Sequence, residues 1–240
     1  MAFRLSDVTA QRLNFLPQKN NGHVLAVPHD YQSIQAALEK AKAGDIIQIY
    51  PGKYMERIQL PDQVHLEGVG INACIEIEQI VVSGMGLLQG VSINECILQN
   101  GASRQAKELS VRKLITEEKS MLSLENSNVD LLIAKGDGFL DNNEIEDVSQ
   151  FSSRWIVEKC SFVGLVSCQQ ALVLFDNCKF TSDGDLLSVD KESEVHLLRC
   201  TFIGKGKIKV GEGNTFRFGC VSLSKALILE GGENVVLPEV

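Results

Sequence analysis

Short alternations of polar and apolar residues recur along the chain at intervals near 20 residues. The clearest copies share the order polar, Cys, polar, apolar: EKCSFVG (158–164), DNCKFTS (176–182), LRCTFIG (198–204) and, more loosely, FGCVSLS (218–224). Their cysteines, Cys160, Cys178, Cys200 and Cys220, are 18, 22 and 20 residues apart. Weaker copies upstream place Ser127, Asn143, Leu114 and Cys96 at the Cys position.

This period predicts a β-solenoid, because the repeat holds short alternating apolar runs and no helical stripe. From Cys74 to Cys220 the repeat averages about 18 residues over eight steps, which predicts eight to nine coils. We therefore expect an all-β chain, a single right-handed parallel β-helix whose strands pair with the same strand of the next coil, about 4.8 Å away.

The cysteines of the repeat are predicted to be buried and unreactive, because a small apolar side chain fits a crowded inward turn. The Phe two positions later points the same way, since the strand period is 2. Asn126, Asn142 and Asn177 come just before the Cys position, where Asn can adopt the left-handed conformation and form a hydrogen-bonded ladder. Cys168 lies off this ladder and is the candidate for a reactive thiol.

Residues 30–43 predict an amphipathic helix, with Ile34, Ala37, Leu38 and Ala41 on one face. Strand-like segments follow it over residues 45–70. Because the open end of a solenoid exposes unpaired backbone and core, we expect this helix to cap the N-terminal end.

The pattern from Tyr31 to Glu56, Y-x-S-I-Q-A-A-L…A-x-x-G-D-I-I-x-I-x-P-G-x-Y-x-E, resembles the entry segment of right-handed parallel β-helix proteins of the pectin-lyase-like superfamily. That superfamily includes pectin methylesterases, polysaccharide lyases and epimerases, and carbohydrate-binding and sugar-hydrolase repeat domains. The resemblance implies the fold, and it implies an activity on polysaccharides only where the active-site motifs are also present.

Those motifs are absent: the chain contains none of the methylesterase, polygalacturonase or pectate lyase signatures. Two acidic clusters remain, around residues 137–147 and 183–194. The Gly in TSDGD (181–185) could aim Asp183 and Asp185 together, and Arg199 could pair with a sugar carboxylate, so these three are the candidate catalytic set. Calcium is a candidate ligand of the same loop. The weaker ligand-binding candidates are Asp137, Asp141, Trp155 and Lys179. Solvated coil corners of an acidic protein would look the same.

Net charge and residue counts limit which classes of partner, cellular location and metal site we expect. The 31 acidic and 23 basic residues give a net charge of −8, which argues against a nucleic-acid partner. No apolar run is long enough for a membrane helix, and residues 1–15 lack the apolar core of a signal peptide. An odd count of seven cysteines, without zinc spacing, favours a reducing, cytoplasmic location. The four scattered histidines predict no metal site.

The expected domain organisation is an N-terminal extension over residues 1–25 and one β-helix domain over residues 26–240. The highly charged residues 102–120 interrupt the rhythm and are a candidate inserted loop. The C-terminal segment from Leu223 shows no cap helix, so that end of the solenoid is a candidate surface for oligomerisation.

Two functions remain open. The first is a non-catalytic intracellular β-helix that presents a sheet face or loops to a protein partner. It is favoured by the missing catalytic signatures and the missing export signal. The alternative is a polysaccharide-active enzyme (lyase, esterase or hydrolase) or a carbohydrate-binding module for acidic sugars, which rests on the resemblance and the acidic clusters.

Overall fold

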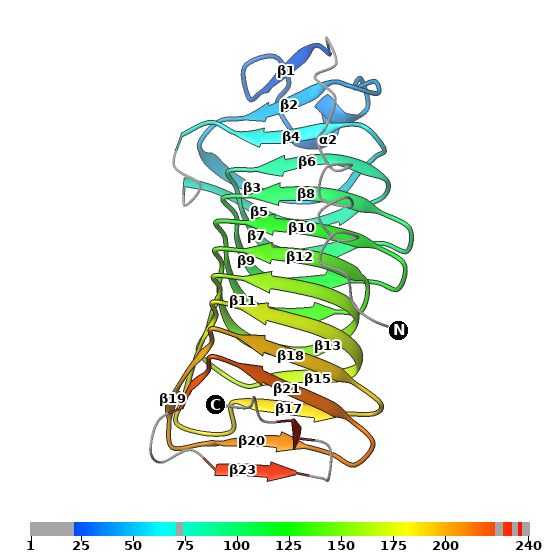
Figure 1. Ribbon diagram of the computed structural model, residues 1–240. Helices are drawn as coiled ribbons and strands as arrows, with labels where there is room; N and C mark the ends of the chain where they lie inside the picture. Colours follow the sequence, from blue (N-terminus) through cyan, green and yellow to red (C-terminus); the bar gives the residue numbers. More distant parts are fainter. Residues whose placement is uncertain (1–21, 71–73, 224–227, 232–234, 237–240) are drawn as a thin grey trace.

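The strands wind into a right-handed parallel β-helix of about 11 turns (Figure 1). This computed structural model describes residues 22–70, 74–223, 228–231 and 235–236. The all-β solenoid prediction is confirmed. The turns outnumber the expected eight to nine because strands before Cys74 and after Cys220 also belong to the solenoid.

Each coil has three faces, joined by a tight corner between the first and second faces and a bend between the second and third. The first face contains β1 (Val24–Val27), β2 (Ile46–Ile49), β4 (His65–Gly68), β6 (Met85–Gln89), β8 (Ser103–Lys107), β10 (Met121–Glu125), β12 (Asp137–Asp141), the last parts of β13 (Glu144–Glu158) and β15 (Val166–Asp176), β18 (Glu194–Leu198), β21 (Thr215–Gly219) and β24 (Val235–Val236).

In the first half of the rod, one bent strand per coil forms both remaining faces: β3 (Gly52–Leu60), β5 (Ile75–Val82), β7 (Ser92–Leu98), β9 (Ser110–Thr116), β11 (Asn128–Ala134) and the first part of β13. Further on, the second face consists of β14 (Ser161–Phe162), β16 (Lys179–Ser182), β19 (Thr201–Gly204) and β22 (Ser222–Leu223). The third face continues with the first part of β15, β17 (Leu187–Asp190), β20 (Lys207–Val210) and β23 (Ile228–Gly231).

The core is a set of ladders of inward side chains, each ladder formed by equivalent residues of successive coils. On the second face, Phe162, Phe180 and Phe202 are in register and buried. The ring centroids of Phe162 and Phe180 are 5.0 Å apart, and those of Phe180 and Phe202 are 4.4 Å apart with nearly parallel planes. The predicted inward direction of these rings is confirmed.

The capping helix is shorter than the predicted 30–43: α2 covers only Ile34–Leu38. The hydroxyl of Ser33 accepts a hydrogen bond from the Ala36 amide, and the Glu56 carboxylate accepts from the Ile34 and Gln35 amides. The helix ends early because residues 39–45 must turn the chain into β2. Its buried side chains pack on the core at the N-terminal end, as expected of a cap.

Residues 102–120 are not an inserted loop. They form β8 and β9, each paired on both sides with neighbouring coils. Their charged side chains mostly point outward, as the strand alternation requires. One does not: Arg104 is completely buried. The predicted N-terminal extension also differs at its end, since Val24 and Leu25 already pair with β2. The rest of that extension, residues 1–21, lies outside the described residues.

Candidate functional site

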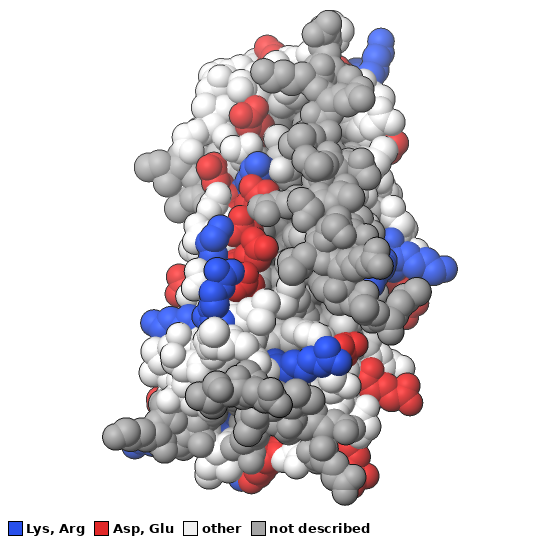
Figure 2. All heavy atoms as spheres, viewed as in Figure 1, with Lys and Arg blue, Asp and Glu red and all other residues white. Residues whose placement is uncertain are grey.

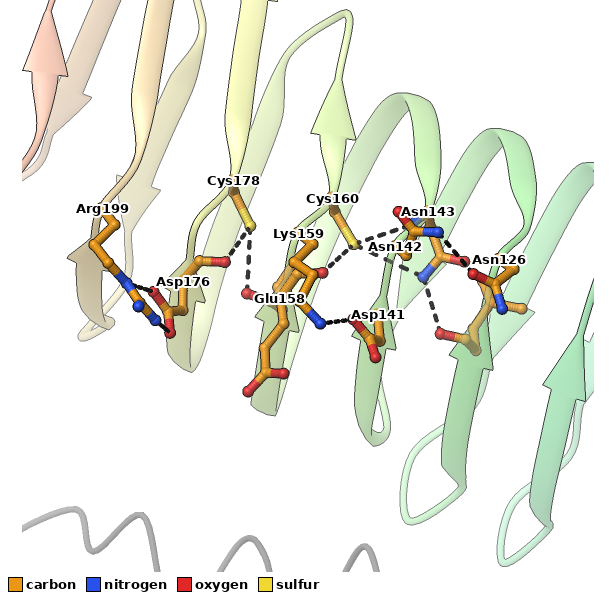
Figure 3. Close-up of polar contacts among 12 residues, drawn as sticks. Asn126, Asp141, Asn142, Asn143, Glu158, Lys159, Cys160, Asp176, Cys178 and Arg199 are labelled. Carbon is orange, nitrogen blue, oxygen red and sulfur yellow. Dashed lines mark hydrogen bonds and ion pairs between the residues drawn. The ribbon is translucent and has the colours of Figure 1, made fainter.

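From Gly90 onward, the tight corner of each coil uses one residue in the left-handed conformation. From Glu108 onward this residue has φ between 50° and 55° in every coil up to Cys220, and three of these residues are the predicted Asn126, Asn142 and Asn177. The Asn142 side-chain amide donates to the Asn126 side-chain oxygen at 2.7 Å (Figure 3). The Asn prediction is therefore confirmed, both for the conformation and for a side-chain contact along the ladder.

The residue directly after the left-handed residue of each tight corner points inward. Cys160, Cys178 and Cys200 share this position. All three are buried, and their thiols donate to backbone carbonyls two residues earlier (Figure 3 shows Cys160 and Cys178). Burial raises the pKa of Cys160 to about 12. This arrangement is packing, as predicted.

The other cysteines do not belong to this ladder. Cys96 is buried on the third face, in register with Ile80 and Leu114. Cys220 is itself the left-handed residue, and both Cys74 and Cys220 are exposed. The prediction of a reactive Cys168 is wrong, because that side chain is fully buried and burial raises the pKa of its thiol.

Just before the tight corner, four carboxylates of successive coils stand in register: Glu125, Asp141, Glu158 and Asp176. Acidic side chains gather along this edge of the rod, with Lys and Arg beside them (Figure 2). Lys159 pairs with Asp141 of the preceding coil at 3.3 Å, and Arg199 grips Asp176 through two guanidinium nitrogens (Figure 3). These pairs offset repulsion between stacked like charges.

The candidate catalytic set is not brought together. Arg199 sits at the tight corner on Asp176. Asp183 and Asp185 lie beyond the opposite end of the second face, in the connection from β16 to β17, and Asp185 pairs with Lys209 at 2.6 Å. The four-residue strand between these places spans about 13 Å. The carboxylates and the guanidinium therefore do not flank a common substrate.

The four ligand-binding candidates are also dispersed. Trp155 is 1% exposed, and its indole N–H donates to the Ser152 carbonyl at 2.9 Å, so it cannot stack on a sugar. Asp137 binds Arg154 at 2.6 Å. Burial by itself would raise the pKa of Asp137, but hydrogen bonds from Arg154 and Ser153 outweigh it and hold the pKa below its usual value. Asp141 is paired as above, and Lys179 is exposed on the second face.

A groove at the bend is the candidate site that the sequence did not reveal. A depression of about 520 Å³ adjoins a second of about 560 Å³, and the two share Asn94, Arg112 and Asp130. We call this continuous depression the bend groove. Its charged lining residues are Lys53, Glu76, Glu78, Glu95, Arg112, Lys113, Asp130, Glu146 and Asp147.

Acidic charge exceeds basic charge in the bend groove. Lys53 is paired with Glu76 at 3.0 Å, and Lys113 with Glu95 at 2.9 Å. That leaves Glu78, Asp130, Glu146 and Asp147 against the single cation Arg112, and none of these five forms an ion pair with another described residue. A groove with uncompensated carboxylates can attract a cationic ligand.

The sequence does contain the repeating pattern that forms this groove, but one of the upstream repeats was aligned in the wrong register. Its central residues Asn94, Arg112, Asp130 and Glu146 each follow an inward apolar residue of the second face. The sequence pattern places Leu114 at the Cys position of the repeat. In the structure, the residue at that position is the buried Leu109, which follows the left-handed Glu108. With that register corrected, the sequence itself predicts that Asn94, Arg112, Asp130 and Glu146 form one outward column across successive coils.

Two further findings concern membranes and metals. Within residues 22–70, 74–223 and the two short described segments that follow, no helix has the length and hydrophobicity to cross a membrane. In the same residues, no three His, Cys, Asp or Glu side chains are grouped so as to hold a metal ion. The calcium site considered for residues 181–185 therefore gains no support.

Comparison with models of known protein families finds no match to the chain, and comparison with curated proteins finds none either.

Proposed function

We propose that this chain is a non-catalytic, intracellular binding solenoid that holds a basic segment of a protein partner in the bend groove. The observation that carries the proposal is the set of four carboxylates, on Glu78, Asp130, Glu146 and Asp147, that face one arginine without ion-pair partners among the described residues. Opposite charge across an interface speeds association and selects the partner.

The rigidity of the scaffold supports the same proposal. The groove residues lie on β3, β5, β7, β9, β11 and β13, and each of these strands pairs in parallel with the next one on both sides of the bend. A binding surface on such strands is already formed before the partner arrives, which lowers the cost of ordering it. The pattern from Tyr31 to Glu56 supports a relationship to the pectin-lyase-like superfamily, which we include in the proposal.

The alternative, an enzyme or binding module for acidic polysaccharides, has less support. A groove that crosses successive coils and the exposed Lys179 would suit an extended sugar chain. The excess of carboxylates in the bend groove, however, would repel a uronate polymer. Asp183, Asp185 and Arg199 lie apart, so the candidate catalytic set that supported the enzyme hypothesis is not assembled.

The test is binding of a fluorescein-labelled peptide with six lysines to the full chain, followed by anisotropy. We expect binding that weakens with added salt and weakens at least tenfold in the variant Asp130→Lys/Glu146→Lys. The matched control Asp183→Lys/Glu212→Lys makes the same charge change at exposed sites outside the groove and should bind like the parent protein.

Equal weakening in both variants would mean that only net charge matters, and the proposal would be wrong. Incubation with neutral and acidic oligosaccharides, read by mass spectrometry, tests the alternative. Shortened, unsaturated or de-esterified products would replace the binding proposal with an enzymatic one.

A further inference from the structure

The column of residues at the bend does not stop where the bend groove ends. Ile145, Phe162, Phe180 and Phe202 are in register on the second face. The residues directly after them are Glu146, Val163, Thr181 and Ile203, and Thr181 is itself paired with Ile203. The outward column therefore changes from charged residues, up to Glu146, to β-branched residues over the next three coils.

Two of these three β-branched side chains are open to solvent, and Thr181 between them is partly exposed. Val163 is 48% exposed and Ile203 is 44% exposed, and Leu165, close to Val163 in the chain, is 39% exposed. Single exposed apolar residues are common on protein surfaces, whereas an aligned group beside a polar rim is typical of an interaction site. Here the alignment follows from the strand register.

The charged and apolar parts meet directly. A Cβ atom placed on Gly164 would lie 2.0 Å from a carboxylate oxygen of Asp147. The Asp147 side chain is thus packed against the backbone of the coil that carries Val163. A ligand that contacts this carboxylate is within one coil of the apolar column.

We propose that the occupant of the bend groove is an extended polypeptide segment with basic residues at one end and β-branched or other apolar residues at the other, lying along the solenoid axis. This inference rests on the proposed function and adds the chemistry of the partner. Charge complementarity accounts for the basic end, and the continuous column from Asp130 to Ile203 accounts for the apolar end.

The length of the segment follows from the coil spacing. Four coil steps separate Asp130 from Ile203, about 19 Å at roughly 4.8 Å per step. An extended chain rises about 3.4 Å per residue, so about six residues cover the distance. With one or two residues beyond each end, the segment has eight to ten residues.

The experiment uses labelled peptides of three designs, four peptides in all, and the full chain. The first is a nonapeptide with three Lys or Arg, three Ser and three Val or Ile, made in both chain directions. The second contains only its basic and Ser residues, and the third has the sequence of the first scrambled. Binding is measured by anisotropy against the parent protein and the variant Val163→Ser/Ile203→Ser, whose fold is checked by circular dichroism.

We expect the nonapeptide, in one direction, to bind at least fivefold more tightly than the basic peptide and the scrambled peptide. Val163→Ser/Ile203→Ser should abolish this advantage and leave the binding of the basic peptide unchanged. The control Met85→Ser/Leu198→Ser removes exposed apolar groups from the first face and should have no effect.

The outcomes separate the two proposals. If the basic peptide binds as tightly as the nonapeptide and the Ser variant changes nothing, the inference is wrong and the proposed function stands. If neither the basic peptide nor the nonapeptide binds, the proposed function and the further inference are both wrong. If the free chain self-associates in sedimentation and Val163→Ser/Ile203→Ser makes it monomeric, the occupant is a second copy, and the inference is overturned.

Discussion

The guanidinium of Arg104 lies inside the solenoid and donates a 2.8 Å hydrogen bond to the carbonyl oxygen of Val64, 40 residues earlier in the chain. It also donates to the Pro61 carbonyl at 3.1 Å. Gly86 is in register with Arg104 on the intervening coil, and its lack of a side chain provides the space for the guanidinium. A Cβ at this position would lie 2.0 Å from the guanidinium. Burial lowers the pKa of Arg104 to about 10, so it stays charged at neutral pH and ties three coils together.

We expect Arg104→Met to lower the free energy of unfolding by about 2 kcal/mol, because the Pro61 and Val64 carbonyls lose their donor. Removal of a buried charge offsets part of that loss. Urea denaturation measures it. The control is Arg154→Met, which breaks an exposed pair with Asp137 and should cost less than about 1 kcal/mol. A variant at residue 104 as stable as the parent would show that the interior does not need these hydrogen bonds.

Asn142→Ala tests the tight corner. Asn142 has φ 55° and donates to Asn126. Ala tolerates this conformation poorly, at a cost of about 1–2 kcal/mol, and it cannot make the side-chain hydrogen bond. We expect a loss of about 1–2 kcal/mol in urea denaturation, against almost none for the exposed Glu144→Ala on the adjacent strand. Equal losses in the two variants would contradict the role assigned to the corner.

Phe180→Ala tests the aromatic ladder. Phe180 is fully buried between Phe162 and Phe202, and solenoid neighbours cannot collapse freely into the space it leaves. Truncation of a buried Phe typically costs about 3–5 kcal/mol. Thermal and urea unfolding should both show the loss. Val163→Ala, on an exposed neighbouring position, should change stability by less than about 0.5 kcal/mol.

Alkylation should separate the cysteines by burial. Under native conditions iodoacetamide should modify Cys74 and Cys220, which are exposed, and spare Cys96, Cys160, Cys168, Cys178 and Cys200, which are buried. Peptide mapping by mass spectrometry reads the outcome, and the unfolded chain in urea, where all seven should react, is the control. Rapid native modification of Cys168 would restore it as a candidate reactive residue.

The buried thiols also predict a pH dependence. Burial raises the pKa of Cys96 from 9.0 to about 12. Above pH 9 the unfolded thiol releases its proton while the folded one keeps it, so the unfolded state binds fewer protons and stability falls as pH rises. At pH 10 this group alone removes about 1.4 kcal/mol relative to neutral pH. The stability gap between the parent and Cys96→Ala should therefore narrow by about that amount from pH 7.5 to pH 10. A constant gap would contradict the raised pKa.

The sequence by itself determined the features that depend on one residue and its neighbours. The left-handed corners followed from Asn126, Asn142 and Asn177, since Asn tolerates that conformation better than most residues. The inward direction of Phe162, Phe180 and Phe202 followed from the strand period of 2. The repeat length was enough to indicate a solenoid, because only stacked coils bury such short strands.

Only the tertiary structure decided which outward side chains become neighbours. Successive tight corners are 16 residues apart from Asn126 to Asn142 but 22 apart from Asn177 to Arg199. With coils of unequal length, no fixed period places Arg104 over Val64, aligns Asp130 with Ile203, or separates Arg199 from Asp185. Those relationships depend on the register of each parallel pairing, which the interior packing of neighbouring coils selects.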